Sequence, residues 1–228
     1  MTDELMAFLA SFAAPLATTV FFFFTSAVLS LLFAIVYVLF SRSGYLPLSA
    51  MSEFLIEVSR GVPTVLFVLL MGNLGLAPYF SGIDVEGIIP GVAYGFGLAA
   101  SFIIVGLAFS SSGHLARIIE AAISTIKQDT IDYMDTLHLG ALAKVRLIFF
   151  ECAPALIPTV SARLVHHLHN TAFISMFPIA GIFAAMRTGV IETAKVIPYL
   201  TFATLLFVLL GTAIHVAGNV LAKRLLTR

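Results

Sequence analysis

Long hydrophobic runs alternate with short polar segments along most of the chain. Each long run has about the 20 residues that a helix needs to cross the hydrocarbon core of a bilayer. The pattern predicts five transmembrane helices, at residues 16–40, 62–80, 87–110, 147–168 and 197–221. A further apolar segment, residues 173–186, is short for a span and predicts a re-entrant or partly buried helix.

Composition excludes a soluble protein. Of the 228 residues, 60% are hydrophobic, 12 are basic and 12 are acidic, and the mean hydropathy is +1.07. A soluble domain of this size could not bury so much apolar surface. The absence of net charge and of any basic tract argues against disorder and nucleic-acid binding. We therefore predict an all-α integral membrane protein, a single transmembrane domain over residues 1–228 in contact with membrane lipid.

The basic residues gather at one set of span ends. That side holds Arg42, Arg60, Arg117, Lys127, Lys144, Arg146, Lys223, Arg224 and Arg228. The other side holds only Arg187 and Lys195. Because lysine and arginine favour the cytoplasmic side, five spans predict an amino terminus outside and a carboxyl terminus in the cytoplasm.

Two local patterns leave a structural and a functional interpretation open. A stripe of small residues, Gly91, Gly95, Gly97 and Ser101, favours close helix packing, either within the chain or in a dimer. Arg60 precedes Pro63 at the start of the second span, where it can anchor at the headgroup level, or else act as a gate or contact the substrate.

The most polar stretch lies between the third and fourth spans, at about residues 114–147. Its apolar positions Ile118, Ala122 and Ile126 keep helical spacing. The stretch therefore predicts a short cytoplasmic helix that docks onto a partner, or else a solvated loop between two spans.

This stretch carries a family resemblance. The segment HLARIIEAAISTIKQDTIDYMDTLHLGALAKVRLIFFECAPALIP resembles the cytoplasmic coupling loop of bacterial ABC-importer permeases of the polar amino-acid type. EVSRGVP at 57–63 resembles the family's E-x-x-R-G-T-P, and HNTAFIS at 169–175 resembles K-D-T-S-L-x-S. The resemblance covers nearly the whole chain. It implies the type I ABC importer permease fold, a multi-pass location in the bacterial inner membrane, and transport of polar amino acids or similar small solutes.

In that family the loop docks onto a cytoplasmic ATPase. The resemblance places the contact surface at Asp132, Tyr133, Met134, His138 and Gly140. It also implies a cytoplasmic ABC ATPase dimer, a second permease chain and an extracytoplasmic solute-binding protein as partners.

The loop also departs from the family pattern. His138 replaces the loop glycine, and Tyr133 and Met134 replace alanines. These changes favour a heterodimer mildly over a homodimer, and they leave open a passive or structural subunit of a transporter or channel. Arg117 and Glu120 carry the family's two charges with exchanged signs, and their spacing of three predicts an ion pair on one helix face.

The sequence contains no G-x-x-x-x-G-K-[ST] loop, so we expect ATP to be bound by a partner and this chain to need no cofactor. No nucleophile–base or zinc-protease motif lies in the spans, which disfavours an enzyme. His166 and His169 share a helix face without a third ligand, so no metal site is predicted.

Polar and ionisable groups at membrane depth are candidates for lining a solute pathway. In this chain they are Arg163, His166, His169, Asn170 and Thr171. Arg163 is the fixed charge deep in the fourth span and is suited to face a substrate carboxylate.

Overall fold

The computed structural model describes residues 2–81, 96–137 and 140–226, and every regular element in these ranges is a helix. In chain order they are α1 (Thr2–Ser11), α2 (Ala13–Ser41), α3 (Leu46–Gly61), α4 (Thr64–Ser81), α6 (Phe96–Ser124), α7 (Gln128–Thr136), α8 (Ala141–Asn170), the 3-10 helix η1 (Thr171–Met176), α9 (Ile182–Thr193) and α10 (Val196–Leu226).

Four helices are long and apolar enough to cross a membrane on their own, and they lie in α2, α6, α8 and α10. The pair α3 and α4 passes the same test when taken together, which gives four or five candidate spans. Three predicted spans, 16–40, 147–168 and 197–221, are confirmed inside α2, α8 and α10. The predicted 87–110 span begins outside the described residues, and its helix α6 continues to Ser124.

The predicted second span is the later half of a broken element. α3 and α4 meet at an angle of 103°. Val62 has φ −95° and ψ 128°, the extended backbone that a following proline imposes, so the helix ends before Pro63 and a new one begins at Thr64. The break ends α3 at Gly61, with Arg60 exposed in its last turn.

The short apolar segment 173–186 does not cross the molecule. It forms the end of η1, a turn, and the start of α9. Ile174, Phe177 and Ile182 are buried, so the prediction of a partly buried helical segment is confirmed.

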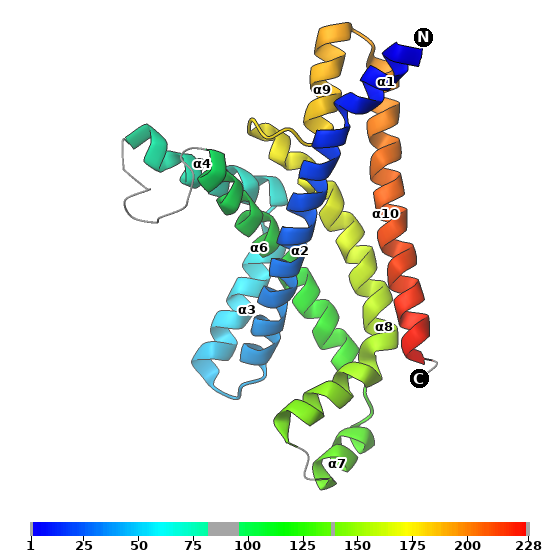
Figure 1. Ribbon diagram of the computed structural model, residues 1–228. Coiled ribbons are helices and arrows are strands. Elements are labelled where there is room, and N and C mark those ends of the chain that lie inside the picture. The colour runs from blue at the N-terminus through cyan, green and yellow to red at the C-terminus, as the bar shows by residue number, and fades with distance from the viewer. Residues whose placement is uncertain (1, 82–95, 138–139, 227–228) are drawn as a thin grey trace.

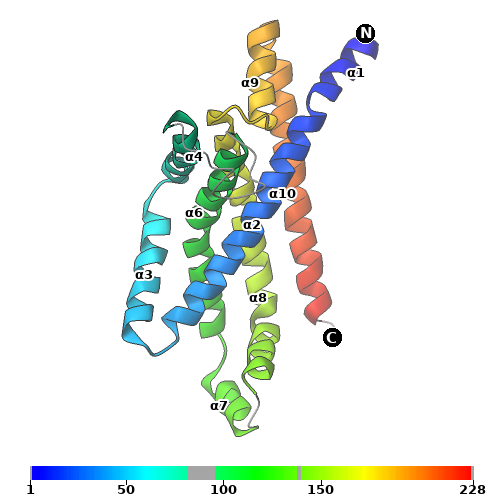
Figure 2. The ribbon, with the colours of Figure 1, turned by 60° about the vertical axis from the view of Figure 1, so that its left-hand side comes forward.

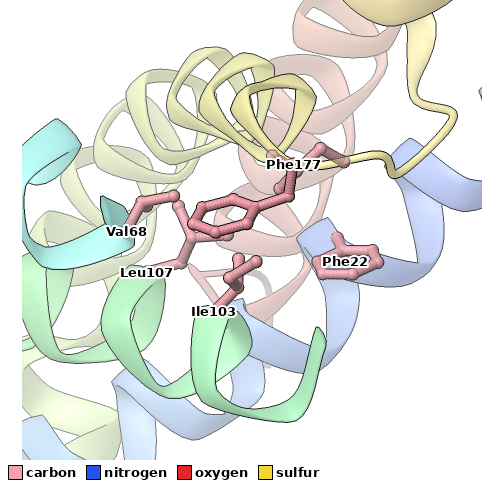
Figure 3. Packing of buried hydrophobic residues seen from close by; sticks show 6 residues of the cluster. Phe22, Val68, Ile103, Leu107 and Phe177 are labelled. Atoms are coloured by element: carbon pink, nitrogen blue, oxygen red, sulfur yellow. The ribbon is translucent and has the colours of Figure 1, made fainter. Parts of the chain in front are cut away.

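α6 is the central helix and packs against α2, α3, α4 and α8. One apolar core joins α2, α4, α6 and η1, where Phe22, Val68, Ile103, Leu107 and Phe177 converge, as Figure 3 shows. Further down α6, a methyl group at Gly113 would overlap the Ser59 hydroxyl and the Ile56 carbonyl, so this glycine allows α3 to approach closely.

The small residues of α6 that allow close packing therefore differ from the predicted stripe. Gly91 and Gly95 lie outside the described residues, and Gly97 and Ser101 are exposed on α6. The close approaches occur later on the helix, at Gly113 and at Gly106, which faces the backbone of α4.

A buried hydrogen-bonded triplet fastens α2, α6 and α8 together. His167 of α8 lies 2.7 Å from the Ser26 hydroxyl through Nε2 and 2.6 Å from the Ser111 hydroxyl through Nδ1. The His167 side chain has no solvent exposure. This histidine is a structural link between three helices.

The amino and carboxyl termini lie at opposite ends of the molecule, as Figures 1 and 2 show. The α2–α3 turn and α7 lie toward the end where the chain finishes. The α9–α10 turn lies at the end where the chain begins.

Candidate functional site

α7 projects from the end of the bundle, between the last turn of α6 and the first turn of α8 (Figures 1 and 2). α6 ends where the hydroxyls of Ser124 and Thr125 donate hydrogen bonds to carbonyls of its last turn. Asp129 lies in the first turn of α7, where a carboxylate interacts favourably with the helix dipole. The connecting segment is therefore shorter than the predicted 114–147, because residues 114–124 belong to α6 and residues 141–147 belong to α8.

The predicted contact residues divide between the two sides of α7. Asp132 is exposed, the Tyr133 side chain is 65% exposed and Met134 is only 6% exposed. Gly140 is exposed just before α8, and His138 lies outside the described residues. Leu137, which the sequence analysis did not select, is 49% exposed beside Tyr133. The outward surface of α7 thus presents an aromatic ring, an aliphatic side chain and a carboxylate.

A charge cluster joins α3 to α6. Arg117 donates to Glu120 over 2.9 Å, which confirms the predicted pair. The same guanidinium lies 2.5 Å from Glu53 and 2.8 Å from Glu57 of α3, two contacts that sequence spacing could not reveal. Glu57 also pairs with Arg60 over 3.0 Å. We call these five residues the α3–α6 charge cluster.

A pocket of about 450 Å³ lies where α3, α6 and α8 meet. Its charged and ionisable lining is basic and consists of Arg60, His114, Arg117 and Arg163. The rest of the lining is Ile118, Ala121, Ala122, Thr125, Ala155, Leu156 and Thr159. We call this space the basic pocket. No carboxylate of a described residue lines it.

The basic pocket reaches from the α7 end of the molecule into the bundle. Thr125 directly follows the last residue of α6, whereas His114 lies 11 residues earlier, about 16 Å along the helix axis. On the α8 side, the pocket passes the segment that holds Pro154 and Pro158. Prolines remove helical hydrogen bonds and bend a helix. Figure 1 shows α8 changing direction after its first turns.

The arginines of the pocket differ in whether they form an ion pair with a carboxylate. Arg60 and Arg117 are paired with carboxylates of the charge cluster. Arg163 Nε is buried and has no hydrogen-bond partner among the described residues. Nor does any described carboxylate form an ion pair with Arg163. Its charge is therefore left to be balanced by something other than these side chains.

The other predicted pathway residues do not line the basic pocket. His166 is exposed, and His169 is exposed with its ring 6.2 Å from that of Phe207. Asn170 is buried and donates to the Thr64 hydroxyl over 3.3 Å, which ties the end of α8 to the start of α4. Thr171 is buried and donates to the Leu168 carbonyl. Of the predicted set, only Arg163 lines the basic pocket.

The sequence did not predict that His114 and Arg60 line the same pocket as Arg163. The available signal was the presence of two ionisable groups next to apolar spans, but only the packing of α3, α6 and α8 brings them to one pocket. No group of three potential metal ligands forms among the described residues.

A second, larger groove of about 940 Å³ is almost wholly apolar. It runs between α2, α8 and α10, and its lining includes Phe24, Leu31, Leu164 and Leu210. Among the described residues, Arg42 at the end of α2 is the only charged side chain in its lining. The groove has the chemistry of a surface that faces lipid or another apolar helix, whereas the basic pocket has that of a site for a polar ligand.

Comparison with known structures shows that the all-helical fold of the chain is similar to that of ABC transporter chains. The chain superimposes on a crystal structure of an amino acid ABC transporter with histidines, with a TM-score of 0.78 and 18% identity over 97% of both chains. It also matches two crystal forms of the MetNI methionine ABC transporter in inward-facing conformations. Their TM-scores are 0.69 and 0.74, with 18% and 16% identity over 99% of each chain.

No protein-family model and no curated protein matches the chain. The structural likeness extends over nearly its full length and includes the arrangement of the spans. The chain therefore has the type I ABC importer permease fold, as its coupling-loop resemblance predicted.

Proposed function

We propose that the chain is the transmembrane permease subunit of an ATP-driven importer, and that it does not itself catalyse a reaction. The observation that carries this proposal is α7, a short helix that projects from a permease fold and exposes Tyr133 and Leu137. Exposed apolar side chains on a projecting helix fit docking into a groove of a partner. The expected partner is a cytoplasmic ABC ATPase dimer, which would bind ATP.

The position of α7 supports a mechanism of alternating access. α7 lies in the connection between α6 and α8, so a partner that moves α7 pushes on both helices. These two helices supply most of the basic pocket. Rigid-body movement of α6 relative to α8 would open the pocket toward one side of the membrane or the other.

The remaining parts of the proposal concern the assembly. Polar amino acids or similar small solutes are the proposed substrates. A second permease chain, identical or paralogous, would complete the pathway, and an extracytoplasmic solute-binding protein would deliver the substrate. The basic residues at the α7 end favour a cytoplasmic location for that end in a bacterial inner membrane.

Co-purification from a mild detergent tests the proposal. We expect mass spectrometry to identify an ATPase in stoichiometric amount. Tyr133→Asp and Leu137→Asp should each reduce its recovery at least tenfold, because each places a charge on the exposed surface of α7. Ser43→Asp, in the exposed α2–α3 turn, is the matched control and should recover the ATPase normally.

Two results would contradict the proposal. One is a chain that purifies without an ATPase even after chemical cross-linking, which would favour a channel or a passive subunit. The other is an ATPase that is retained by both α7 variants as well as by the wild-type chain.

A further inference from the structure

The basic pocket contains one arginine, Arg163, that no carboxylate of a described residue pairs with. Arg163, His114, Arg60 and Arg117 line it, and the carboxylates that pair with Arg60 and Arg117 lie outside its lining. A buried guanidinium without a partner is costly, since its desolvation is not offset by hydrogen bonds. For Arg163 this applies to one atom: Nε is buried and has no hydrogen-bond partner among the described residues, whereas the side chain as a whole is half-buried.

The non-basic lining indicates what kind of ligand would suit the pocket. Thr125 and Thr159 supply hydroxyls, and the other positions are apolar. A ligand ammonium group would therefore meet basic side chains and no lining carboxylate. An anionic group would instead accept charge-assisted hydrogen bonds from Arg163, and guanidinium groups bind carboxylate and phosphate in a bidentate manner.

We propose that the basic pocket holds the anionic group of the transported solute, so that the substrate is a small molecule with net negative charge, bearing a carboxylate or a phosphate. The inference rests on the proposed function, since it assigns the substrate class of that permease. Arg163 is the primary ligand-binding residue. His114 and Arg60, the latter paired with Glu57, line the same space.

The volume and position of the pocket agree with this role. A space of about 450 Å³ lies within the range of small-molecule sites. It lies between α6 and α8, the two helices that α7 connects. A solute bound there would touch both helices that the proposed mechanism moves.

Thermal unfolding of the purified chain tests the inference without any ATPase. The probes are L-glutamate and inorganic phosphate, with L-glutamine and L-lysine compared at equal ionic strength. We expect at least one of the two anions to raise the unfolding midpoint saturably, and glutamine and lysine to leave it unchanged. Arg163→Gln should raise the half-saturating concentration about tenfold or more, and Arg163→Lys should restore part of the affinity.

Arg187→Gln is the matched control, because it removes the same charge from an exposed position on α9 away from the pocket. Its titration should match that of the wild-type chain. Equal shifts for all four probes, no shift with either anion, or an unchanged titration in Arg163→Gln would each overturn the proposal.

A lipid headgroup has the same anionic chemistry, and a second arm distinguishes it. The titrations are repeated in nanodiscs of phosphatidylcholine with and without phosphatidylglycerol. Anion shifts that persist in both support a solute site. If only phosphatidylglycerol gives an Arg163-dependent shift, the pocket holds a lipid headgroup and the substrate assignment is wrong. Anion binding in a chain that does not co-purify with an ATPase would support the anion site but contradict the importer function. A co-purifying ATPase without anion binding would contradict only the substrate assignment.

Discussion

His167 illustrates what a single residue contributes to the fold. Its two ring nitrogens contact Ser26 of α2 and Ser111 of α6, so one imidazole satisfies hydrogen bonds toward two neighbouring helices. Interhelical hydrogen bonds in membranes contribute about 0.6 kcal/mol each on average. The side chain also fills a fully buried space between these helices.

We expect His167→Ala to lower the free energy of unfolding by about 1–3 kcal/mol, because both hydrogen bonds are lost and a cavity remains. The measurement is thermal unfolding in detergent, followed by far-UV circular dichroism. His166→Ala is the adjacent control, and its exposed side chain should change stability by no more than about 0.5 kcal/mol. Equal effects of the two variants would contradict the structural role of His167.

At this scale the sequence identified Arg163 as a candidate ligand-binding residue. It could not show which of the neighbouring histidines is buried and which are exposed. The pattern places His166, His167 and His169 within one turn of the same helix. Their different environments depend on which neighbouring helix faces each ring. Ser26 and Ser111 are 141 and 56 residues distant from His167, so no local spacing reports these contacts.

At the scale of elements, the α3–α6 charge cluster holds the amphipathic helix α3 against the central helix. One guanidinium, that of Arg117, serves Glu53, Glu57 and Glu120 together. A shared partner makes these contacts interdependent, since its removal leaves three carboxylates near one another.

We expect Arg117→Gln to lower the unfolding midpoint more than Arg60→Gln, which removes only the single pair with Glu57. Combining Arg117→Gln with Glu120→Gln should recover part of the loss, because Glu53 and Glu120 are the carboxylates left unpaired and one of the two is then neutral. Thermal unfolding of five proteins provides the comparison: the wild type, Arg117→Gln, Arg60→Gln, Glu120→Gln and the double variant. Additive losses in the double variant would show that the cluster does not act as a unit.

The elements were predictable to different degrees. Hydropathy located α2, α8 and α10, because each must present apolar side chains over the thickness of a bilayer. It missed α3 as a helix of the bundle, since Glu53, Glu57 and Arg60 interrupt its apolar pattern. The Arg117–Glu120 pair followed from helical spacing, whereas the contacts to α3 required the tertiary fold.

At the scale of the whole molecule, the two ends differ in charge. The α7 end carries most of the lysines and arginines, and the opposite end includes Arg187 of α9 and Lys195 of the α9–α10 turn. Cys152 is the one cysteine of the chain and is buried in α8. A Cys152→Ala background would therefore let single introduced thiols report the orientation.

We expect Lys195→Cys to react with a membrane-impermeant maleimide in intact cells, and Ser43→Cys to react only after permeabilisation. Both positions are exposed and lie at opposite ends of the molecule. The physical reason is the preference of basic residues for the cytoplasmic side. The reverse labelling pattern would invert the proposed topology, and labelling of both positions in intact cells would argue against a spanning arrangement.

The position of the basic pocket between α6 and α8 has a thermodynamic consequence. An anion that bridges His114 and Arg163 favours one spacing of these two helices over another. Binding energies at two sites on one molecule are coupled reciprocally. Under the proposed function, a nucleotide-driven displacement of α7 would weaken anion binding by a certain free energy, and a bound anion would then oppose that displacement by the same free energy. Solute binding to the pocket and nucleotide binding to the partner would then each shift the same conformational equilibrium.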